Sequence, residues 1–362
     1  MKIVVGLSGG VDSSVVAALL KEQGHDVIGV TMQLCDPANP HPGKGCFCMS
    51  QLDEIETSRR IAQRLGIEHH VIDCSKEYAD TILKYFTDEY KAGNTPNPCL
   101  ICNAKFKFGL LLKLIEEKIG KFDKFATGHY ARVLYSEPVN CYSLHAAHCR
   151  EKDQSYFLSR LTQEQLAKVV FPLGEFESKE DVRALAVKYG LETAEKEDSQ
   201  DFYSGNKAEL IEDETFNLVR GECVCSRVVD INGNKLGHHA GYWKYTISQR
   251  HGFSCKSAVP MYVLKILPET NTLVVGTKDQ AYRSSFRVKD INWITADPCM
   301  TITVDVKIRS SGSNFYHCSL GMDGHVTCLE SCKRMFGVTP GQFAVFYCGD
   351  MVVGSGVICQ VN

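Results

Sequence analysis

The stretch Gly6-Leu7-Ser8-Gly9-Gly10-Val11-Asp12-Ser13-Ser14 separates the apolar run Ile3-Val4-Val5 from a segment in which apolar residues recur at helical spacing. This order predicts a strand, a tight turn and a helix. Gly9 and Gly10 permit positive φ angles and a close approach of the backbone to a ligand, while the serines place hydroxyls and unpaired N–H groups at the start of the helix. We therefore expect an anion of phosphate size to bind at this turn.

The turn matches neither of the two most familiar nucleotide-binding motifs. A Walker A loop needs Gly-Lys-Ser/Thr after the glycines, and a dinucleotide fold needs Gly-x-Gly-x-x-Gly. The segment from Ser8 to Ser13 instead resembles the PP-loop of ATP pyrophosphatases, enzymes that split ATP into AMP and pyrophosphate while activating an oxygen as an adenylate. The resemblance implies that ATP, with Mg²⁺, is bound by Gly6, Leu7, Ser8, Gly9, Gly10, Val11, Asp12 and Ser13.

The composition is that of an ordinary globular protein with more than one domain. The 362 residues exceed what a single core usually holds, and 44% of them are hydrophobic and 23% charged. The net charge of −3 excludes a uniformly basic surface, so a nucleic-acid site would have to be a local patch. The sequence has no apolar stretch of membrane-spanning length and no signal-peptide core, so we expect a cytoplasmic protein without a membrane partner.

Apolar runs and helical periodicity alternate through the first part of the chain. Strands are expected at 27–32, 70–73 and 125–130, with helices at 52–65 and 105–119. This alternation predicts an α/β fold with a doubly wound parallel sheet, whose ligands bind at the carboxyl ends of the strands. The phosphate-binding turn, Met32 and Gly128-His129 all fall at such ends.

Beyond Gly205 the pattern changes to short β-rich runs separated by Asn-Gly, Pro-Gly and Cys-Gly-Asp turns. Strands are expected at 223–225, 228–230, 262–266, 272–276, 301–306, 343–347 and 351–353. Such runs predict a small all-β domain or a barrel in the C-terminal part of the chain.

Seven motifs in a fixed order make the chain similar to the tRNA-specific 2-thiouridylase family, the sulfurtransferases that place sulfur on C2 of the wobble uridine, U34. The motifs are the PP-loop and the segments 97–103, 126–132, 152–158, 198–200, 245–250 and 339–342. The resemblance extends over nearly the whole chain. It implies a PP-loop pyrophosphatase domain at 1–207, a small central domain at 208–276 and a C-terminal β-barrel at 277–362.

The resemblance also implies a mechanism, in which ATP adenylates the uridine 2-oxygen and a sulfur nucleophile displaces AMP. Met32 and Gly128 would line the adenosine, and Cys102 would be the nucleophile, activated beside Lys105 or Lys107. The residues implied to contact tRNA are Asn97, Pro98, His129, Lys152, Asp153, Gln154, Lys307, Arg309, Ser310 and Gln342. The sulfur donor would be a persulfide carrier protein, a cysteine desulfurase or sulfide, and we expect a monomer or a weak dimer.

Two positions depart from the family pattern, and both concern the sulfur chemistry. Better-known members carry aspartate where this chain has Cys99, and a second catalytic cysteine where it has Tyr203. Cys99 and Cys102, expected on a proline-rich loop, could act as a persulfide and resolving pair. Alternatively, with Cys46 or Cys48 as a third thiolate, they could hold a [4Fe–4S] cluster or, ranked below both, a structural zinc ion.

The chain has 17 cysteines, an odd number that, without a secretory signal, indicates reduced thiols, redox chemistry or metal binding. Those of the β-rich region are interpreted as packing residues: Cys223, Cys225, Cys318, Cys328, Cys332 and Cys348. Two other functions stay open at this point. One is a PP-loop ligase that adenylates a small molecule, and the other is a non-catalytic RNA-binding or sulfur-carrier protein.

Overall fold

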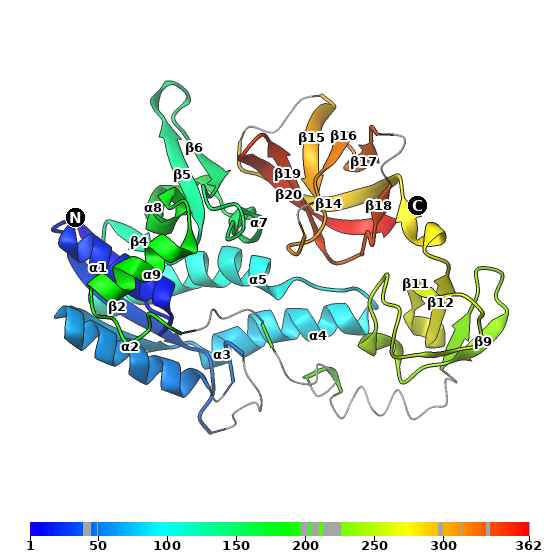
Figure 1. The fold of residues 1–362 in the computed structure, drawn as a ribbon, viewed down its shortest axis with the longest axis horizontal. Helices are drawn as coiled ribbons and strands as arrows, with labels where there is room; N and C mark the ends of the chain where they lie inside the picture. Colours follow the sequence, from blue (N-terminus) through cyan, green and yellow to red (C-terminus); the bar gives the residue numbers. More distant parts are fainter. Residues whose placement is uncertain are drawn as a thin grey trace.

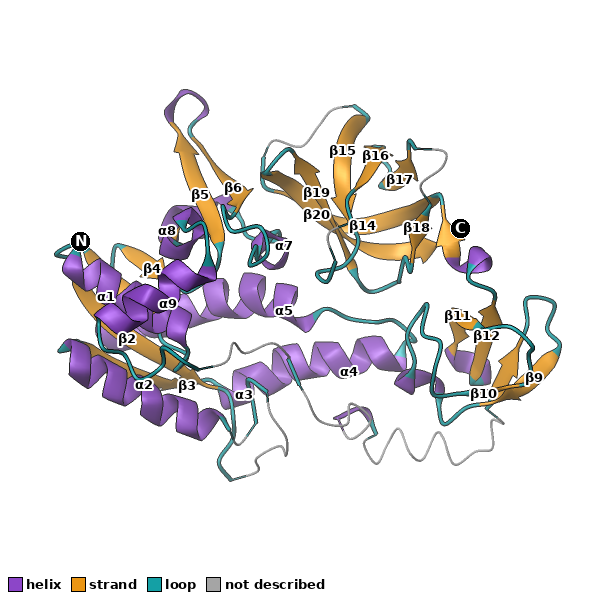
Figure 2. Cartoon of the chain, in the orientation of Figure 1, coloured by secondary structure: helices purple, strands orange, loops and turns teal. Residues whose placement is uncertain are grey.

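The computed structural model describes residues 1–38, 45–48, 50–196, 202–203, 210–212, 226–295, 300–312, 314–330 and 334–361. An α/β part formed by the N-terminal half lies at the left of Figure 1, a β-barrel at the upper right and a small β-sheet at the lower right. Figure 2 shows that nearly all helices belong to the first part and that the other two are built from strands. None of the described helices is long and apolar enough to span a membrane.

The N-terminal part contains a five-stranded sheet in the order β3-β2-β1-β4-β7, in which every neighbouring pair is parallel. The strands are β1 (Lys2–Gly6), β2 (Asp26–Gln33), β3 (Glu68–Asp73), β4 (Lys124–Ala126) and β7 (Val169–Val170). The chain runs outward from β1 to β2 and β3, then returns to the other side of β1 as β4. This arrangement confirms the predicted doubly wound sheet, and its switch point lies at the end of β1, where such folds bind their ligands.

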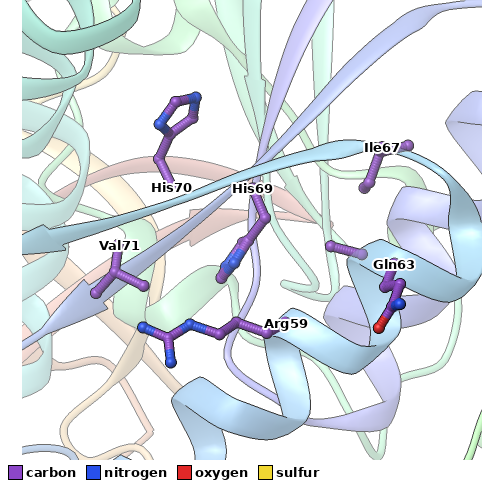
Figure 3. Close-up of a pocket in the computed structure, with 7 residues that line it drawn as sticks. Arg59, Gln63, Ile67, His69, His70 and Val71 are labelled. Carbon is purple, nitrogen blue, oxygen red and sulfur yellow. The ribbon is translucent and has the colours of Figure 1, made fainter.

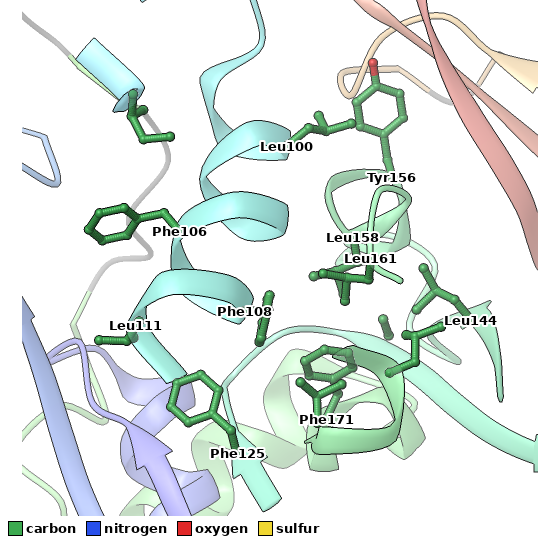
Figure 4. Packing of buried hydrophobic residues seen from close by; sticks show 14 of the residues in the cluster. Leu100, Phe106, Phe108, Leu111, Phe125, Leu144, Tyr156, Leu158, Leu161 and Phe171 are labelled. Carbon is green, nitrogen blue, oxygen red and sulfur yellow. The ribbon is translucent and has the colours of Figure 1, made fainter. Parts of the chain in front are cut away.

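Successive residues of β1 face opposite layers of the domain. Ile3 and Val5 pack with α1 (Val11–Glu22), α2 (Gln51–Leu65) and α9 (Lys179–Lys188), whereas Val4 packs on the other face. That second layer is shown in Figure 4, where Phe108 of the helical segment at 98–119 packs against Phe125 and Phe171. Because β1 is covered on both sides, its sequence is continuously apolar rather than alternating.

The two cysteines of 99–102 lie at the start of a helix, so the predicted loop is wrong at this point. Asn97 is the N-cap, Pro98 opens α5 (Pro98–Ile101), and the chain continues through the π-helical segment η2 (Cys102–Leu110) into α6 (Leu111–Ile119). Proline is well tolerated at the first helical position, since the N–H that it lacks would have no helical partner there. The predicted loop is therefore confined to the residues before Pro98.

A hairpin that the sequence analysis does not predict joins the α/β part to the barrel. It consists of β5 (Ala131–Ser136) and β6 (Cys141–Ala146) and projects upward in Figure 1. His145 and Leu144 of β6 pair with Met351 and Val352 of the barrel strand β20. The junction is reinforced where Asp350 accepts a hydrogen bond from Arg132 and contacts His145 Nδ1 at 3.2 Å.

The C-terminal strands form the predicted small β domain and barrel. The small sheet has the order β10-β9-β8-β12-β11, and the barrel has β14-β17-β16-β15-β19-β20, closed by pairing of β14 with β20. Their bounds are β8 (Arg227–Val229), β9 (Lys235–His238), β10 (Ser254–Cys255), β11 (Tyr262–Leu267), β12 (Thr272–Gly276), β14 (Ser285–Trp293), β15 (Ile302–Lys307), β16 (Tyr316–Leu320), β17 (His325–Cys328), β19 (Phe343–Cys348) and β20 (Met351–Val361). The strand expected at 223–225 lies outside the described residues.

Short elements complete the chain. They are α3 (Ser75–Tyr78), η1 (Ala79–Leu83), α4 (Lys84–Lys91), η3 (Glu137–Val139), α7 (Ser155–Leu158), α8 (Gln163–Lys168), η4 (Pro172–Glu175), η5 (Tyr242–Lys244), η6 (Pro268–Thr270), η7 (Asp279–Ala281), β13 (Tyr282–Arg283) and β18 (Met335–Phe336). Of these, η1 continues α3 into α4, so 75–91 forms one interrupted helix.

Candidate active site

The glycine-rich turn between β1 and α1 is held in shape by its own serines. The backbone N–H of Ser8 donates to Ser13 Oγ over 3.1 Å, and Ser14 Oγ donates to the Gly10 carbonyl over 2.7 Å. Gly9 has φ +69°, and a Cβ at this position would lie 2.6 Å from the carbonyl oxygen of Glu54, so only glycine fits. Gly10 is the N-cap of α1 and provides no side-chain cap, which leaves the helix start suited to an anion.

The ends of β2 and β4 flank this turn, as the strand order requires. Gly128 follows β4, and a Cβ there would lie 2.7 Å from Asp12 Cβ and 2.9 Å from the Ser13 nitrogen. Met32, at the end of β2, is partly buried, and its carbonyl accepts a hydrogen bond from Gln51 over 3.3 Å. The two residues expected near adenosine therefore lie on strands that neighbour β1 on either side.

Asp12 is held by two residues that the sequence analysis does not assign to the site. Lys179 Nζ donates to Asp12 Oδ1 over 2.7 Å and to Oδ2 over 2.8 Å, and the Tyr130 hydroxyl donates to Oδ1 over 2.8 Å. A second lysine, Lys196, donates to the Gly9 carbonyl over 2.9 Å. Lys179 is 167 positions from Asp12, so no local spacing could have revealed the pair.

The oxygen-bearing side chains of the turn fit a magnesium ion beside the phosphates of ATP. The Asp12 carboxylate is 27% exposed, and the hydroxyl oxygens of Ser8 and Ser13 lie 3.1 Å apart. Carboxylate and hydroxyl oxygens, together with phosphate oxygens of the substrate, are ligands that Mg²⁺ prefers. Asp12 would be the charged protein ligand of that ion.

Cys102 is a protonated thiol in this arrangement. Burial raises its pKa to about 12, and the neighbouring Cys46 and Cys99 add to that effect. Lys107 lowers the pKa of Cys102, in the direction expected from the sequence, but burial outweighs it. Lys107 therefore acts on Cys102 as the sequence predicts, but the thiol stays protonated at neutral pH.

A third thiol, that of Cys46, belongs to the same neighbourhood. Its sulfur lies 3.1 Å from the Tyr78 hydroxyl, and burial raises its pKa. The pKa of Tyr78 is raised well above its usual value by burial, and Cys46, Cys102 and Cys99 add to this effect. The Tyr78 ring makes an edge contact with Phe106 on the cysteine-bearing helix, at a centroid distance of 5.4 Å. Of the four cysteines proposed as cluster ligands, Cys46 contacts this tyrosine and Cys102 and Cys99 lie within electrostatic range of it.

Cys48 lies near Cys46 but is not among the described residues that shift the pKa of Cys102 or Tyr78. It is buried, and its pKa is raised to about 11 by burial and then by Cys46 and Cys35. Within the described ranges, no group of three or more histidine, cysteine, aspartate or glutamate side chains is arranged to hold a metal ion. The described side chains thus do not form a ready iron–sulfur or zinc site, and we derive no step through such a group.

Glu54 connects the phosphate-binding turn to the thiols. Its backbone is the close neighbour of Gly9, and its carboxylate raises the pKa of Cys46, which in turn affects Cys102. The pKa of Glu54 is raised by burial and lowered by Lys196. Glu54 therefore touches the turn through its backbone and lies within electrostatic range of Cys46 through its carboxylate.

Tyr203, at the position of the missing second cysteine, is a buried packing residue. It is 5% exposed, and its ring stacks on Phe47 with centroids 5.5 Å apart. Its backbone forms a bridge with Gly45, which places it beside the segment that carries Cys46. The motif at 198–200 lies outside the described residues.

Two groups of predicted tRNA-contacting residues, from distant parts of the sequence, meet around Tyr156. Lys307 of the barrel lies over the Tyr156 ring, with its ammonium 5.9 Å from the ring centre. The charge of Asp153 favours the protonated form of Lys307, and the charge of Arg309 opposes the rise that burial causes in the pKa of Tyr156. Asp153 accepts hydrogen bonds from the backbone of Ala147 and from Ser155, so it also shapes the turn that carries Lys152 and Gln154. Arg309 is exposed and Ser310 partly so.

Asn97, Pro98 and Gln342 lie where the three parts of the chain join. Gln342 Nε2 donates to the carbonyls of Thr95 and Pro96, over 2.9 and 3.1 Å. Thr95 Oγ1 lies 2.5 Å from Thr246 Oγ1 of the small β domain. The linker before the cysteine helix is therefore fixed by both C-terminal parts.

His129 and Gln154 make internal contacts near β4. His129 Nδ1 lies 2.7 Å from Thr127 Oγ1, its ring packs between Phe108 and Phe171, and burial lowers its pKa well below the usual value. Gln154 Oε1 accepts from the Tyr130 backbone over 3.0 Å. Both residues can position the segment after β4.

The interpretation of the remaining cysteines is correct in part. Cys318 is buried and Cys328 partly buried, as packing residues should be. Cys348 is exposed, because it is the last residue of β19, where the chain turns at the barrel surface, so the packing interpretation is wrong for it. Cys223, Cys225 and Cys332 lie outside the described residues.

A hollow of about 420 Å³ lies between α2 and the edge strand β3, lined by Arg59, Ala62, Gln63, Ile67, His69, His70 and Val71 (Figure 3). It contains none of the predicted site residues. His69 reaches inward, with Nε2 2.9 Å from Thr31 Oγ1, and the Thr31 hydroxyl donates to the Leu7 carbonyl over 2.9 Å. His69 therefore donates to Thr31 from its neutral ring and supports the backbone that enters the turn.

Comparison with known proteins connects the three parts of the fold to one family. Family models match residues 1–203 (tRNA methyl transferase HUP domain), 225–277 (tRNA methyl transferase PRC-barrel domain) and 283–358 (aminomethyltransferase β-barrel domain). A protein of Endomicrobium trichonymphae named tRNA-specific 2-thiouridylase MnmA is 42% identical over 99% of both chains. The chain belongs to the tRNA-specific 2-thiouridylase family.

Two further 2-thiouridylases show the same extent of similarity. The proteins named tRNA-specific 2-thiouridylase MnmA from Trichlorobacter lovleyi and from Synechocystis are each 40% identical, over 99% of this chain and 97% of theirs. The match thus includes the PP-loop part, the central sheet and the barrel together. This agrees with the resemblance that the seven sequence motifs indicate.

Proposed function

We propose that this protein is an ATP-dependent tRNA uridine 2-sulfurtransferase that acts on U34. The observation that supports this most directly is the phosphate-binding turn, tightly packed against Glu54 and the end of β4, within a chain similar to 2-thiouridylases over its full length. A PP-loop ligase acting on a small molecule would need neither the cysteine helix nor the barrel.

The proposed reaction begins with activation of the uridine. The C2 carbonyl is a poor electrophile with a poor leaving oxygen, so its oxygen attacks the α-phosphate of ATP and becomes an adenylate, with pyrophosphate as the other product. The backbone of the turn, from Gly6 to Ser13, would hold the phosphates, and Asp12 would hold the Mg²⁺. Met32 and Gly128 would flank the adenosine.

Sulfur transfer would then use Cys99 and Cys102, one turn apart on the helix that starts at Pro98. One thiol carries the sulfur as a persulfide, whose terminal sulfur attacks C2 and displaces AMP. The other thiol attacks the cysteine sulfur of the resulting cysteine–uridine disulfide, which leaves 2-thiouridine and a Cys99–Cys102 disulfide. A thiol reductant opens that disulfide before a persulfide donor recharges the pair, whereas sulfide would recharge it by attacking the disulfide directly, giving a persulfide on one cysteine and a thiol on the other. Because burial keeps the pKa of Cys102 high, we expect tRNA binding to change its surroundings before it reacts.

An iron–sulfur cluster as sulfur carrier is the alternative to the persulfide pair. The position of Cys46 beside Tyr78 and near Cys102 makes it, rather than Cys48, the third cysteine to test. Cys46→Ser should matter only if a cluster is used, whereas Cys99→Ser and Cys102→Ser should matter in both cases. The visible absorbance of anaerobically purified protein separates the two alternatives.

The proposed partners are tRNA and a sulfur donor, either a persulfide carrier protein, a cysteine desulfurase or sulfide. The tRNA would contact the patch formed by Lys152, Lys307, Arg309 and Ser310, together with Asn97, Pro98, His129, Asp153, Gln154 and Gln342. The net charge of −3 makes such a local patch necessary. We also propose that the protein is cytoplasmic and acts as a monomer or weak dimer.

Product analysis of ATP tests the activation step. With tRNA present, α-labelled ATP should yield AMP, and γ-labelled ATP should yield pyrophosphate. Asp12→Ala and Ser13→Ala should abolish both products, whereas Lys76→Ala, at an exposed ion pair on α3, should not. Formation of ADP and phosphate would contradict the proposed reaction.

A further inference from the structure

The phosphate-binding turn contains no positively charged residue of its own. A Walker A loop carries a lysine within the motif, whereas this turn contributes a carboxylate, Asp12, and no basic residue. The phosphates of ATP are strongly negative, so Asp12 would repel them at close range whenever Mg²⁺ does not lie between them. A cation should therefore be supplied from elsewhere in the fold.

Lys179 is placed to be that cation. It is only 6% exposed, its ammonium makes two short contacts with Asp12, and it lies 5.6 Å from the centre of the Tyr130 ring. Buried lysines are rare, and a buried ion pair contributes little net stability compared with apolar residues of the same size. Fold stability alone therefore gives a weak reason for a lysine at this position.

The segment that begins with Lys179 also holds a second lysine at the turn. Lys179 is the first residue of α9, whose Val182 and Ala186 pack in the same core as α1. Arg183, one turn further, donates to the Lys196 carbonyl over 3.1 Å, and Lys196 in turn reaches the Gly9 carbonyl. Docking of α9 against α1 thus brings two ammonium groups to a turn that has none.

We propose that Lys179 is the cation of the phosphate site, carried by α9 in place of the lysine that the turn lacks. Before ATP binds, its ammonium neutralises and orients Asp12. When ATP binds, the same ammonium offsets the charge of the pyrophosphate part, with Lys196 as a second cation at Gly9. This inference rests on the proposed use of ATP, but it concerns phosphate binding and can be tested without sulfur chemistry.

The test compares variants by their affinity for inorganic pyrophosphate in the absence of metal, measured by titration calorimetry on the full chain. Lys179→Met should weaken pyrophosphate binding at least tenfold. The matched control is Lys188→Met, on the same helix, where the lysine is 57% exposed and paired with Glu22 at 2.7 Å. Lys188→Met should bind pyrophosphate like the wild type.

In Lys179→Met the partly buried Asp12 carboxylate loses its ion-pair partner, which could itself weaken binding or prevent folding. A second comparison therefore measures the contribution of Lys179 in proteins that lack the Asp12 charge. Asp12→Asn keeps the lysine, and the double variant with Lys179→Met loses both charges. Asp12→Asn should bind pyrophosphate at least tenfold more tightly than the double variant. Equal affinities of these two proteins, or wild-type affinity in Lys179→Met, would overturn the inference.

The two proposals fail in different ways. A wild-type protein that binds pyrophosphate through Lys179 but makes no 2-thiouridine would overturn the proposed function and leave this inference standing. A protein that thiolates tRNA but binds pyrophosphate equally well without Lys179 would do the opposite. Wild-type protein that binds neither pyrophosphate nor ATP would overturn both.

Discussion

Gly128→Ala should displace the phosphate-binding turn. The added Cβ would lie 2.7 Å from Asp12 Cβ, 2.9 Å from the Ser13 nitrogen and 3.0 Å from the Asp12 carbonyl carbon, and all three atoms belong to the start of α1. Ordinary contacts need roughly 3.5–4 Å, so the turn and the end of β4 must separate by about 1 Å. The turn has little room to yield, because Gly9 already abuts the backbone of Glu54.

The expected cost falls mainly on catalysis. Misplacing reacting groups by about 1 Å can cost roughly a hundredfold in rate, so we expect kcat/KM for ATP to fall by about ten- to a hundredfold. Overpacking at a tight site should lower the free energy of unfolding by about 1–3 kcal/mol. The assay is the initial rate of tRNA-dependent AMP formation over a range of ATP concentrations, with urea unfolding measured in parallel.

A remote glycine provides the matched control. Gly24 has φ +82° and no atom within 4 Å of an added Cβ, so Gly24→Ala should cost about 1 kcal/mol of stability through backbone strain alone. Its kcat/KM should equal that of the wild type. Wild-type kcat/KM in Gly128→Ala, or an equal loss in Gly24→Ala, would refute the reasoning.

Three further predictions concern sulfur, tRNA and pH. Cys99→Ser and Cys102→Ser should each lose thiolation of tRNA, measured as 2-thiouridine, while the exposed Cys348→Ser should keep it; full activity in either of the first two would contradict the pair. Arg309→Ala should weaken tRNA binding several-fold and make its salt dependence shallower by about one unit, as a lost phosphate contact would, and an unchanged salt slope would place the patch elsewhere. Burial lowers the pKa of His69 to about 4, below the value of about 6.5 expected when unfolded, so the native state binds fewer protons and stability is lost as the pH falls through this range. His69→Gln should therefore lose about 2 kcal/mol less than the wild type between about pH 7 and about pH 5, measured by urea unfolding, and identical pH dependence would contradict this assignment.

The part of the site that lies at strand ends could be predicted from the sequence. Parallel strands place their carboxyl ends at one edge of the sheet, so an apolar run followed by Ser8, Met32 or Gly128 is enough to predict where those residues lie. The strand pairing Val5↔Gly29 and Val5↔Ala126 brings the three ends together as expected. The fold of the C-terminal part was likewise predictable from its short runs and turns.

The residues that the sequence could not reveal act across long separations. Lys179 meets Asp12 only because α9 packs beside α1, and lysines at the start of helices are otherwise ordinary surface residues. Cys46 and Cys48 were both candidates for the third thiolate, and that Cys46 rather than Cys48 lies beside Tyr78 depends on the packing of Tyr78 against Phe106 of the cysteine helix. Such contacts depend on tertiary packing, for which spacing along the chain gives no signal.

The start of the cysteine helix was predicted incorrectly for a different reason. Two prolines before Cys99 correctly indicate an irregular segment, but Pro98 also fits the first position of a helix, and the sequence alone does not decide between the two. Hydrogen bonds from Gln342 and contacts of Thr95 with Thr246 settle where the linker ends. The helix therefore begins at Pro98, seven residues before the predicted start at Lys105.

The most direct test of the central claim is nucleoside mass analysis of a tRNA with unmodified U34 after incubation with the protein, ATP, Mg²⁺, a cysteine desulfurase with cysteine as persulfide donor, and a thiol reductant. The account predicts replacement of one oxygen by sulfur at U34, with AMP formed in at least equal amount, and no replacement with Cys102→Ser. A U34 that stays unmodified or gains a methyl group, or thiolation without formation of AMP, would contradict it.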